Sequence, residues 1–225
     1  MNEEDDGGIP PQQRRQAQDR IERAVQDLAA ERIDEEAWHE EISGALTQAY
    51  LAAASPSGQS GHSGDAAVWR AARYLNTKAL KGDGSFLDIG CANGLLMESV
   101  VLWAGESGLA IEPYGLDISA ELVDLARRRL PQWAGRIVQG NARFWKPLQP
   151  FDYVRTGIEY APPGRQGELL LHLFEHCVAG GGRLIVGTQR HAYRAEVEGA
   201  LAAAGLGPVG SAVDSLRCVL WVDKD

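Results

Sequence analysis

The stretch that most constrains this chain is residues 86–96, which read FLDIGCANGLL. A short apolar run carrying one acid, Asp88, leads into a turn of small residues from Gly90 to Gly94. Apolar residues at helical spacing begin at Leu95. This order predicts a strand, a tight turn and a helix. Glycine allows backbone angles that side chains forbid, so a ligand can touch the main chain there while the first helical N–H groups point at it.

The rest of the C-terminal part alternates between strand and helix patterns, which predicts an α/β fold with a doubly wound, mostly parallel sheet. Pro131 and the glycines at 180–182 supply two of the breaks between these patterns. The expected strands are 85–89, one that ends at Asp117, 136–139, 151–157, 183–187, 208–213 and 217–222, and the expected helices are 94–104, 120–130, 166–178 and 193–204.

Three segments precede or begin this part of the chain. Residues 1–13 are polar and contain two prolines and two glycines, so we expect a disordered tail. Residues 14–64 carry two helical patterns and then the Ser/Gly-rich stretch 55–64, which predicts a helical hairpin with a flexible joint. Asp34 and Asp65 are placed to cap the helices that follow them, and the helix after Asp65 is expected to run to about Leu80.

The motif D-x-G-C-A-N-G of Asp88–Gly94 resembles motif I of the class I S-adenosylmethionine (SAM)-dependent methyltransferases. It differs from the dinucleotide motif because Ala92 stands where a second glycine is expected. Gly115–Ser119 and Asn141-Ala142 resemble later motifs of the same family, in the same order. The resemblance covers about residues 65–225. It implies a seven-stranded Rossmann-like methyltransferase fold with a terminal antiparallel hairpin, here with an N-terminal helical extension. It further implies SAM as cofactor and methyl transfer to an oxygen, nitrogen or carbon atom.

Two polar positions carry most of the expected cofactor recognition. Asp117 closes the second strand at roughly the 20-residue distance from the glycine turn at which an acid accepts hydrogen bonds from ribose hydroxyls. Glu112 is the weaker alternative. The amide of Asn141 can pair with adenine. The full set of expected cofactor-binding residues is Arg73, Asp88, Gly90, Cys91, Ala92, Asn93, Gly94, Asp117, Ile118, Asn141, Ala142 and Thr156.

The methyl-acceptor side has candidates but no assigned catalytic residue. The fourth strand ends in polar residues, and the carboxyl ends of parallel strands face the ligand crevice. Glu159 and Tyr160 are therefore candidates, and an Arg155–Glu159 ion pair is the structural alternative. His62 could act as a base if the joint closes. The sulfonium leaving group is already activated, so positioning alone can suffice.

Residues 172–176, HLFEH, match an inverted zincin pattern. The apolar stripe of that helix leaves both histidines at its margin, so we interpret them as surface residues and expect no metal site. Ala161-Pro162-Pro163 lacks the Asn or Asp that precedes the prolines in amino methyltransferases, which weakens a case for nucleobase methylation.

Composition limits the partners. A net charge of −9 argues against general binding to nucleic acid or anionic membranes, and 44% hydrophobic residues suffice for a sizeable core. The three cysteines have neither metal nor disulfide spacing, which fits a reducing cytosol. We see no signal peptide and no membrane-spanning run, and expect a cytoplasmic protein.

We therefore expect an enzyme with a small-molecule methyl acceptor. The alternatives are a protein or RNA acceptor, and a SAM-binding module without transferase activity. The hairpin is expected to form a lid, with Trp69 over the pocket and Arg73 facing the SAM carboxylate. Its other interpretation is a surface for a homodimer.

Overall fold

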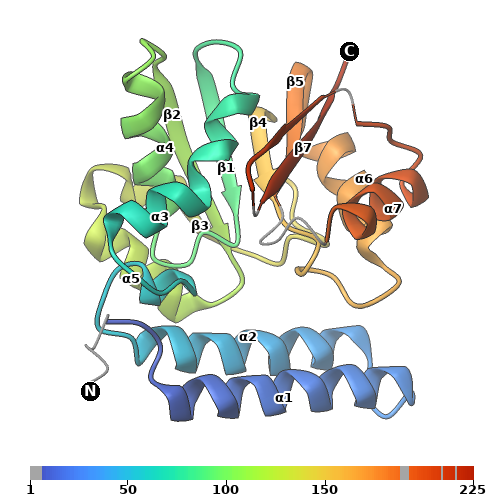
Figure 1. Ribbon diagram of the computed structural model, residues 1–225. Coiled ribbons are helices and arrows are strands. Elements are labelled where there is room, and N and C mark those ends of the chain that lie inside the picture. The colour runs from blue at the N-terminus through green and yellow to red at the C-terminus, as the bar shows by residue number, and fades with distance from the viewer. Residues whose placement is uncertain (1–6, 188–192, 209, 216) are drawn as a thin grey trace.

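The computed structural model describes residues 7–187, 193–208, 210–215 and 217–225. Its elements alternate as expected from β1 onward (Figure 1). They are α1 (Pro11–Ala29), α2 (Glu35–Leu51), η1 (Gly58–Ser60), α3 (Ala66–Arg73), η2 (Tyr74–Ala79), β1 (Gly84–Ile89), α4 (Leu95–Gly105), β2 (Ile111–Asp117), α5 (Ala120–Arg129), η3 (Pro131–Arg136), β3 (Ile137–Gln139), β4 (Phe151–Thr156), α6 (Gln166–His176), β5 (Val178–Gly187), α7 (Arg194–Ala203), β6 (Gly210–Val213) and β7 (Cys218–Asp223).

The seven strands form one sheet in the order β3-β2-β1-β4-β5-β7-β6. The first five are parallel, whereas β7 runs antiparallel to both β5 and β6. The chain reverses direction along the sheet after β3, between β1 and β4. In open α/β sheets, ligands bind beside the carboxyl ends of the strands at such a switch point.

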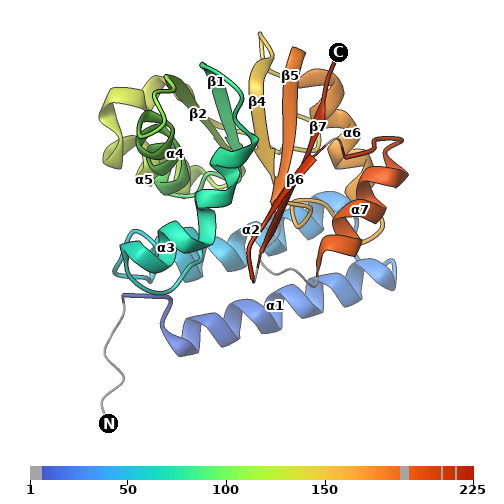
Figure 2. The same ribbon diagram turned by 45° about the horizontal axis from the view of Figure 1, so that its top comes forward.

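Helices cover both faces of the sheet, with α3, α4 and α5 on one side and α6 and α7 on the other (Figures 1 and 2). Successive residues of a strand point to opposite faces. In β1, Phe86 packs in the cluster that holds Trp69 and Trp103, whereas Leu87 packs with Leu169 of α6. Both β1 residues are buried, so the strand anchors the two cores at once.

The N-terminal hairpin lies across the carboxyl ends of the parallel strands (Figure 1). Asp34 caps α2 as predicted, because its carboxylate accepts from the N–H of Ala37 at 2.9 Å. Buried alanines join the two helices, among them Ala17 of α1 and Ala45 and Ala49 of α2.

The predicted tail and joint are more ordered than their composition suggested. The helix α1 begins at Pro11, because proline fits the first helical position, where its missing N–H is not needed. Ile9 packs against the hairpin core, and the carbonyl of Gly7 accepts from Ser55 N–H. Residues 1–6 lie outside the described part of the chain.

The Ser/Gly-rich segment 55–64 is a hydrogen-bonded turn rather than an open joint. It contains η1, and the Ser57 hydroxyl donates to the carbonyl of Gly64 at 2.9 Å. Gly61 adopts φ 72°, and a Cβ there would collide with the ring of Tyr50. The serines and glycines thus serve turn geometry and close packing.

Two further boundaries differ from prediction. The helix that begins at Ala66 gives way to the 3-10 helix η2 after Arg73. The strand β5 begins at Val178, so the three glycines at 180–182 lie within it, next to a register irregularity opposite Phe151. Glycine tolerates such irregularities in a strand.

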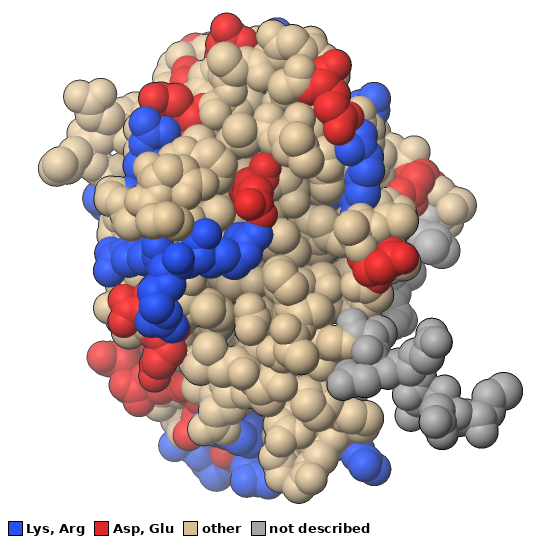
Figure 3. All heavy atoms as spheres, turned by 90° about the vertical axis from the view of Figure 1, so that its left-hand side faces the viewer, with Lys and Arg blue, Asp and Glu red and all other residues tan. Residues whose placement is uncertain are grey.

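The surface carries mixed charge. Figure 3 shows one side of the molecule, where basic and acidic groups lie near one another on a mostly uncharged surface. Ion pairs on α4 and α5 include Arg127–Asp124 and Arg129–Glu98. Among the described residues, no helix is both long and apolar enough to cross a membrane, and the three cysteines are buried and form no disulfide.

Candidate functional site

The turn after β1 combines positive backbone angles with close packing against Tyr160. Gly90 and Gly94 have φ of 71° and 76°, and Ala92 also has positive φ, at 48°. Gly90 and Cys91 donate their N–H groups to the carbonyl of Leu116, which ties the turn to β2. A Cβ on Gly90 would lie 2.3 Å from the Tyr160 ring. Glycine is therefore required at this position both by the positive φ and by the contact with Tyr160.

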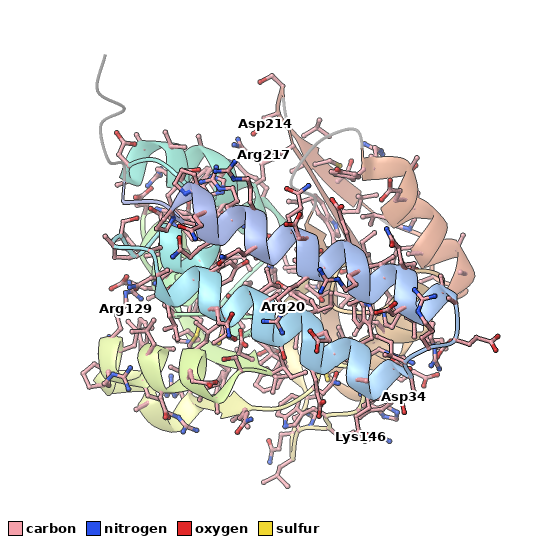
Figure 4. The ribbon with its side chains drawn as sticks, turned by 90° about the horizontal axis from the view of Figure 1, so that it is seen from below. Arg20, Asp34, Arg129, Lys146, Asp214 and Arg217 are labelled. Atoms are coloured by element: carbon pink, nitrogen blue, oxygen red, sulfur yellow. The ribbon has the colours of Figure 1, made fainter. Side chains whose placement is uncertain are left out.

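A cavity of about 350 Å³ lies between this turn and the hairpin. The strand ends supply Asp88–Ala92, Leu116–Ser119, Gly140–Ala142, Arg155, Glu159 and Tyr160. The helix α2 supplies Trp38, His39, Ile42, Ser43, Leu46, Thr47 and Tyr50. In Figure 4, α1 and α2 cross the view in front of the strand ends, with Asp34 and Lys146 labelled at the same end of α2.

Asp117 is fixed where β2 ends. Its carboxylate accepts from the backbone N–H of Ala92 at 2.8 Å and of Ser119 at 2.9 Å. Burial raises the pKa of Asp117, and the hydrogen bonds from Ser119 and Ala92 oppose that shift. A carboxylate has about four acceptor positions, so two N–H groups leave capacity for a ligand.

Asn141 occupies the neighbouring position after β3. Its Oδ1 accepts from the backbone N–H of Arg143 at 3.0 Å, which orients the amide and leaves its NH₂ group as donor. Apolar walls stand close by, from Ile118 and Leu122. A flat ring with hydrogen-bonding edges fits such a surface.

Asp88 and Arg155 form a buried ion pair at the opposite end of the cavity. They are register partners on β1 and β4 and so face the same side, with Asp88 Oδ1 3.3 Å from Arg155 Nη1. Burial raises the pKa of Asp88 to about 6, although the charges of Arg155 and Arg73 oppose the shift.

Arg73 adds a second cation to this end. It lines the cavity beside Trp69, with its guanidinium 5.4 Å from the ring centroid. The Nε atoms of Arg73 and Arg155 are both buried, and neither has a hydrogen-bond partner. An unpaired buried donor costs free energy, so these groups are suited to an anionic ligand group.

Several predicted site residues line this cavity together: Arg73, Asp88, Gly90, Cys91, Ala92, Asp117, Ile118, Asn141, Ala142, Glu159 and Tyr160. Tyr160 covers Gly90, and burial raises its pKa. Glu159 is exposed. The predicted alternative, an Arg155–Glu159 ion pair, is not found among the described residues, where Arg155 pairs with Asp88 instead.

Asn93, Gly94, Thr156 and His62 do not line the cavity. Asn93 is fully buried and holds the 55–64 segment, donating to the Pro56 carbonyl at 2.8 Å and accepting from the Ser60 hydroxyl at 2.6 Å. A Cβ on Gly94 would meet Leu130. Thr156 is fully buried and donates to the Gly157 carbonyl. His62 packs edge-on against Trp69 at 5.8 Å.

No family model and no curated protein matches the chain. Solved structures do match it. A putative methyltransferase from Pseudomonas syringae is 21% identical, with a TM-score of 0.55 over 70% of this chain and 99% of that one. A SAM-dependent methyltransferase from Aquifex aeolicus is 16% identical, with a TM-score of 0.52 over 68% of this chain and 88% of that one.

The chain has the class I SAM-dependent methyltransferase fold. A third similar structure is the 1,6-didemethyltoxoflavin-N1-methyltransferase from Burkholderia thailandensis with bound S-adenosylhomocysteine (SAH). It is 19% identical, with a TM-score of 0.52 over 71% of this chain and 79% of that one.

The histidines of the zincin-like pattern lie on α6, outside the cavity. His172 contacts the Trp145 carbonyl through Nε2 at 2.9 Å, and Glu175 and His176 are exposed. Within the described ranges, no group of three or more His, Cys, Asp or Glu side chains is arranged to hold a metal ion.

Sequence reasoning missed the polar residues that α2 presents to the cavity. His39 is 7% exposed and Trp38 is 4% exposed. The signal was present, because Ile42 and Leu46 follow His39 at helical spacing and mark the same buried face. His39 was not among the residues expected at the site.

Proposed function

We propose that this protein is a SAM-dependent methyltransferase that acts on a small molecule. The observation that carries the proposal is the alignment of the Gly90 turn, Asp117 and Asn141 along one wall of a single cavity. These groups offer a main-chain surface, a ribose acceptor and an adenine partner in the order that the cofactor requires. Because of the fold, the cavity lies at the switch point of the sheet.

Different residues bind different parts of the cofactor in this proposal. Asp117 accepts from the ribose hydroxyls, and Asn141 pairs with the adenine edge between apolar walls. Arg73 receives the carboxylate of the methionine part, and Asp88 attracts its ammonium group. SAM supplies a methyl group on a sulfonium, which is a good leaving group. The protein's contribution is to hold the acceptor in line and to exclude water.

The size and covering of the cavity favour a small acceptor. Ligand pockets have volumes of roughly 300–1,000 Å³, so about 350 Å³ holds one ligand of the cofactor's size and leaves little space for an acceptor beside it. Seven side chains of α2 cover the cavity, which leaves little room for a polymer. The net charge of −9 also opposes an RNA acceptor.

Titration calorimetry with SAM, SAH and NAD tests cofactor recognition. We expect one SAM or SAH per chain and no heat with NAD. Methyl-labelled SAM incubated with separate pools of metabolites, protein and RNA then tests the acceptor class. Label is expected in the small-molecule pool. NAD binding, or no SAM binding, contradicts the proposal, and label in RNA or protein corrects the acceptor.

A further inference from the structure

Arg155 is a buried cation whose guanidinium lies between two strands of the sheet. It is 5% exposed and lines the cavity. Towards β1, its Nη1 lies 3.3 Å from Asp88 Oδ1. Towards β5, a Cβ added to Gly187 would lie 3.7 Å from Nη2 and 3.9 Å from Nε. The Nε–Nη2 edge of Arg155 therefore faces a position on β5 that carries no side chain.

This edge of Arg155 holds a donor without a partner. The Nε atom is buried and makes no hydrogen bond, which is rare in folded proteins because the lost hydration is not compensated. Neighbouring N–H groups of a guanidinium match the two oxygen atoms of a carboxylate. Gly187 does not have the left-handed φ that would demand glycine, so the backbone alone does not explain why a side chain is absent beside this edge.

Asn76 presents a hydrogen-bond acceptor to the same position. Its Nδ2 donates to the carbonyl of Arg73 at 2.8 Å, which orients the amide. Its Oδ1 is buried without a partner and lies 3.6 Å from the Cβ position of Gly187. A ligand group at this position meets a donor from Arg155 and an acceptor from Asn76. A carboxylate with an O–H or N–H group next to it satisfies both.

The strand order places Arg155 and Asn76 on the methyl side of the expected cofactor. Asn141 follows β3 and Asp117 ends β2, whereas Arg155 lies on β4, beyond β1. A cofactor with its adenosine at Asn141 and Asp117 directs its methionine part towards β4. A ligand held by Arg155 then lies on the side of the cofactor from which the methyl group leaves.

The charges at this end of the cavity favour a negatively charged ligand in addition to the cofactor. In the proposed binding mode, the carboxylate and the ammonium group of SAM pair with Arg73 and Asp88. Arg155 then shares its counter-ion with the ammonium group, and the sulfonium adds a further positive charge. Glu159 also lines the cavity, but it is exposed. Because a buried charge without a counter-ion is costly, an anion beside Arg155 is favoured and a second ammonium group is disfavoured.

We propose that Arg155 and Asn76 determine the specificity for the methyl acceptor and that this acceptor is a small hydroxycarboxylate. This inference rests on the proposed function. The carboxylate binds the Nε–Nη2 edge of Arg155, the hydroxyl donates to Asn76 Oδ1, and the absence of a side chain at Gly187 leaves room for both. A small acceptor also agrees with the little space that the cofactor leaves in the cavity.

Four small probes added to the SAH complex test the site without turnover. Lactate has both groups, propionate lacks the hydroxyl, lactamide lacks the charge, and alanine has an ammonium group in place of the hydroxyl. The Arg155 Nε–H resonance, assigned by its loss in Arg155→Lys, reports binding in NMR titrations. Lactate should shift this resonance and bind about threefold or more tightly than propionate, and about tenfold or more tightly than lactamide and alanine.

Gly187→Ala tests whether this edge of Arg155 is the binding position. The added Cβ would have its nearest contact at 3.6 Å, so the variant should fold and keep its SAH affinity within about threefold. Its affinity for lactate should fall about tenfold or more, because the methyl group occupies the position of the ligand. Gly199→Ala is the matched control, since Gly199 is exposed on α7 and an added Cβ there would meet no neighbouring atom within 4 Å. It should change neither affinity.

A labelling experiment tests the acceptor class with turnover. The small-molecule pool is divided on an anion exchanger, and each fraction is incubated with the protein and methyl-labelled SAM. Label is expected in products from the retained, anionic fraction, at a rate that Gly187→Ala reduces and Gly199→Ala does not. Label in products of the unretained fraction alone would contradict an anionic acceptor.

The outcomes separate this inference from the proposed function. If the wild type binds neither SAM nor SAH, the proposed function fails and this inference fails with it. If SAH binds but lactate leaves the Arg155 resonance in place, or binds equally well to Gly187→Ala, the acceptor site is wrong. If lactate displaces SAH, Arg155 binds the carboxylate of the cofactor instead. Alanine binding as tightly as lactate would contradict the argument from charge.

Discussion

At the scale of residues, Asp117 has two tasks. It ties the turn after β1 to the start of α5 through the N–H groups of Ala92 and Ser119, and it faces the cavity. A side chain with both tasks affects folding and binding together. Substitutions must therefore be measured on both properties.

Asp117→Ala should weaken SAM binding by about 1.5–3 kcal/mol, the range for hydrogen bonds to charged groups. Calorimetry measures the loss, and thermal unfolding checks that the variant is folded. Glu112→Ala is the matched control, because Glu112 lies on the same strand but is exposed and pairs with Arg136. Equal SAM affinity in the wild type and in Asp117→Ala would show that Asp117 does not bind SAM.

SAM affinity should rise with pH as Asp88 ionises, because only the carboxylate attracts the ammonium group. The folded pKa is raised from 3.8 to about 6, so the change is centred near pH 6. The same shift means that Asp88 contributes stability below its unfolded pKa and that this contribution is lost as pH rises through about 6. Calorimetry across this window measures the affinity, and an affinity independent of pH would contradict the assignment.

The residues of the site could be predicted from the sequence where a local motif defines them. Asp88, Gly90, Asp117 and Asn141 were predicted from their order in the chain, and all four line one cavity. Asn93 was predicted to bind the cofactor, but its amide holds a segment more than thirty positions away in the chain. No local pattern reveals that long-range contact.

At the scale of elements, the hairpin decides what the cavity can admit. One end of α2 is attached through Glu35 to Arg143 and Arg165, and the following segment is attached through Ser60 to Asn93. Both attachments join the hairpin to loops that follow sheet strands. Binding at the strand ends should therefore alter the hairpin.

Hydrogen exchange should show residues 14–75 gaining more protection on SAM addition than the sheet strands gain. The reason is that α2 contributes one side of the cavity, so a ligand bridges the hairpin to the strand ends. SAM that protects only the loops after β1, β2 and β3 would instead indicate a rigid hairpin without a lid function.

Asn93→Ala should reduce the free energy of unfolding by about 1–3 kcal/mol, because it removes the buried amide that binds the carbonyl of Pro56 and the hydroxyl of Ser60. Urea unfolding measures this loss. The role assigned to Asn93 would be wrong if stability were unchanged and only SAM affinity fell.

The helices and strands could be predicted from the periodicity of apolar residues, but the ordered structure of residues 55–64 could not. Serine and glycine are common in flexible linkers, and their composition predicted a joint. Here Ser57 and Ser60 find partners and Gly61 makes room for Tyr50. Composition alone cannot distinguish a linker from a packed turn, because the difference lies in distant partners.

At the scale of the whole molecule, the strand order accounts for the position of the site. The direction in which successive strands are added to the sheet reverses between β1 and β4. The hairpin covers the carboxyl ends of the parallel strands there (Figure 1). Alternating patterns and a family resemblance predicted this topology. They could not predict which face of the hairpin meets the cavity, since that depends on how α2 docks.

The account's central claim is that one cavity, between the strand ends and α2, holds the cofactor. A crystal structure of the full chain with SAH tests it most directly. We expect the ribose hydroxyls on Asp117, the adenine beside Asn141, the carboxylate at Arg73, and α2 over the ligand. SAH bound elsewhere, or bound in this cavity without contact to Asp117 and Asn141, would contradict the account.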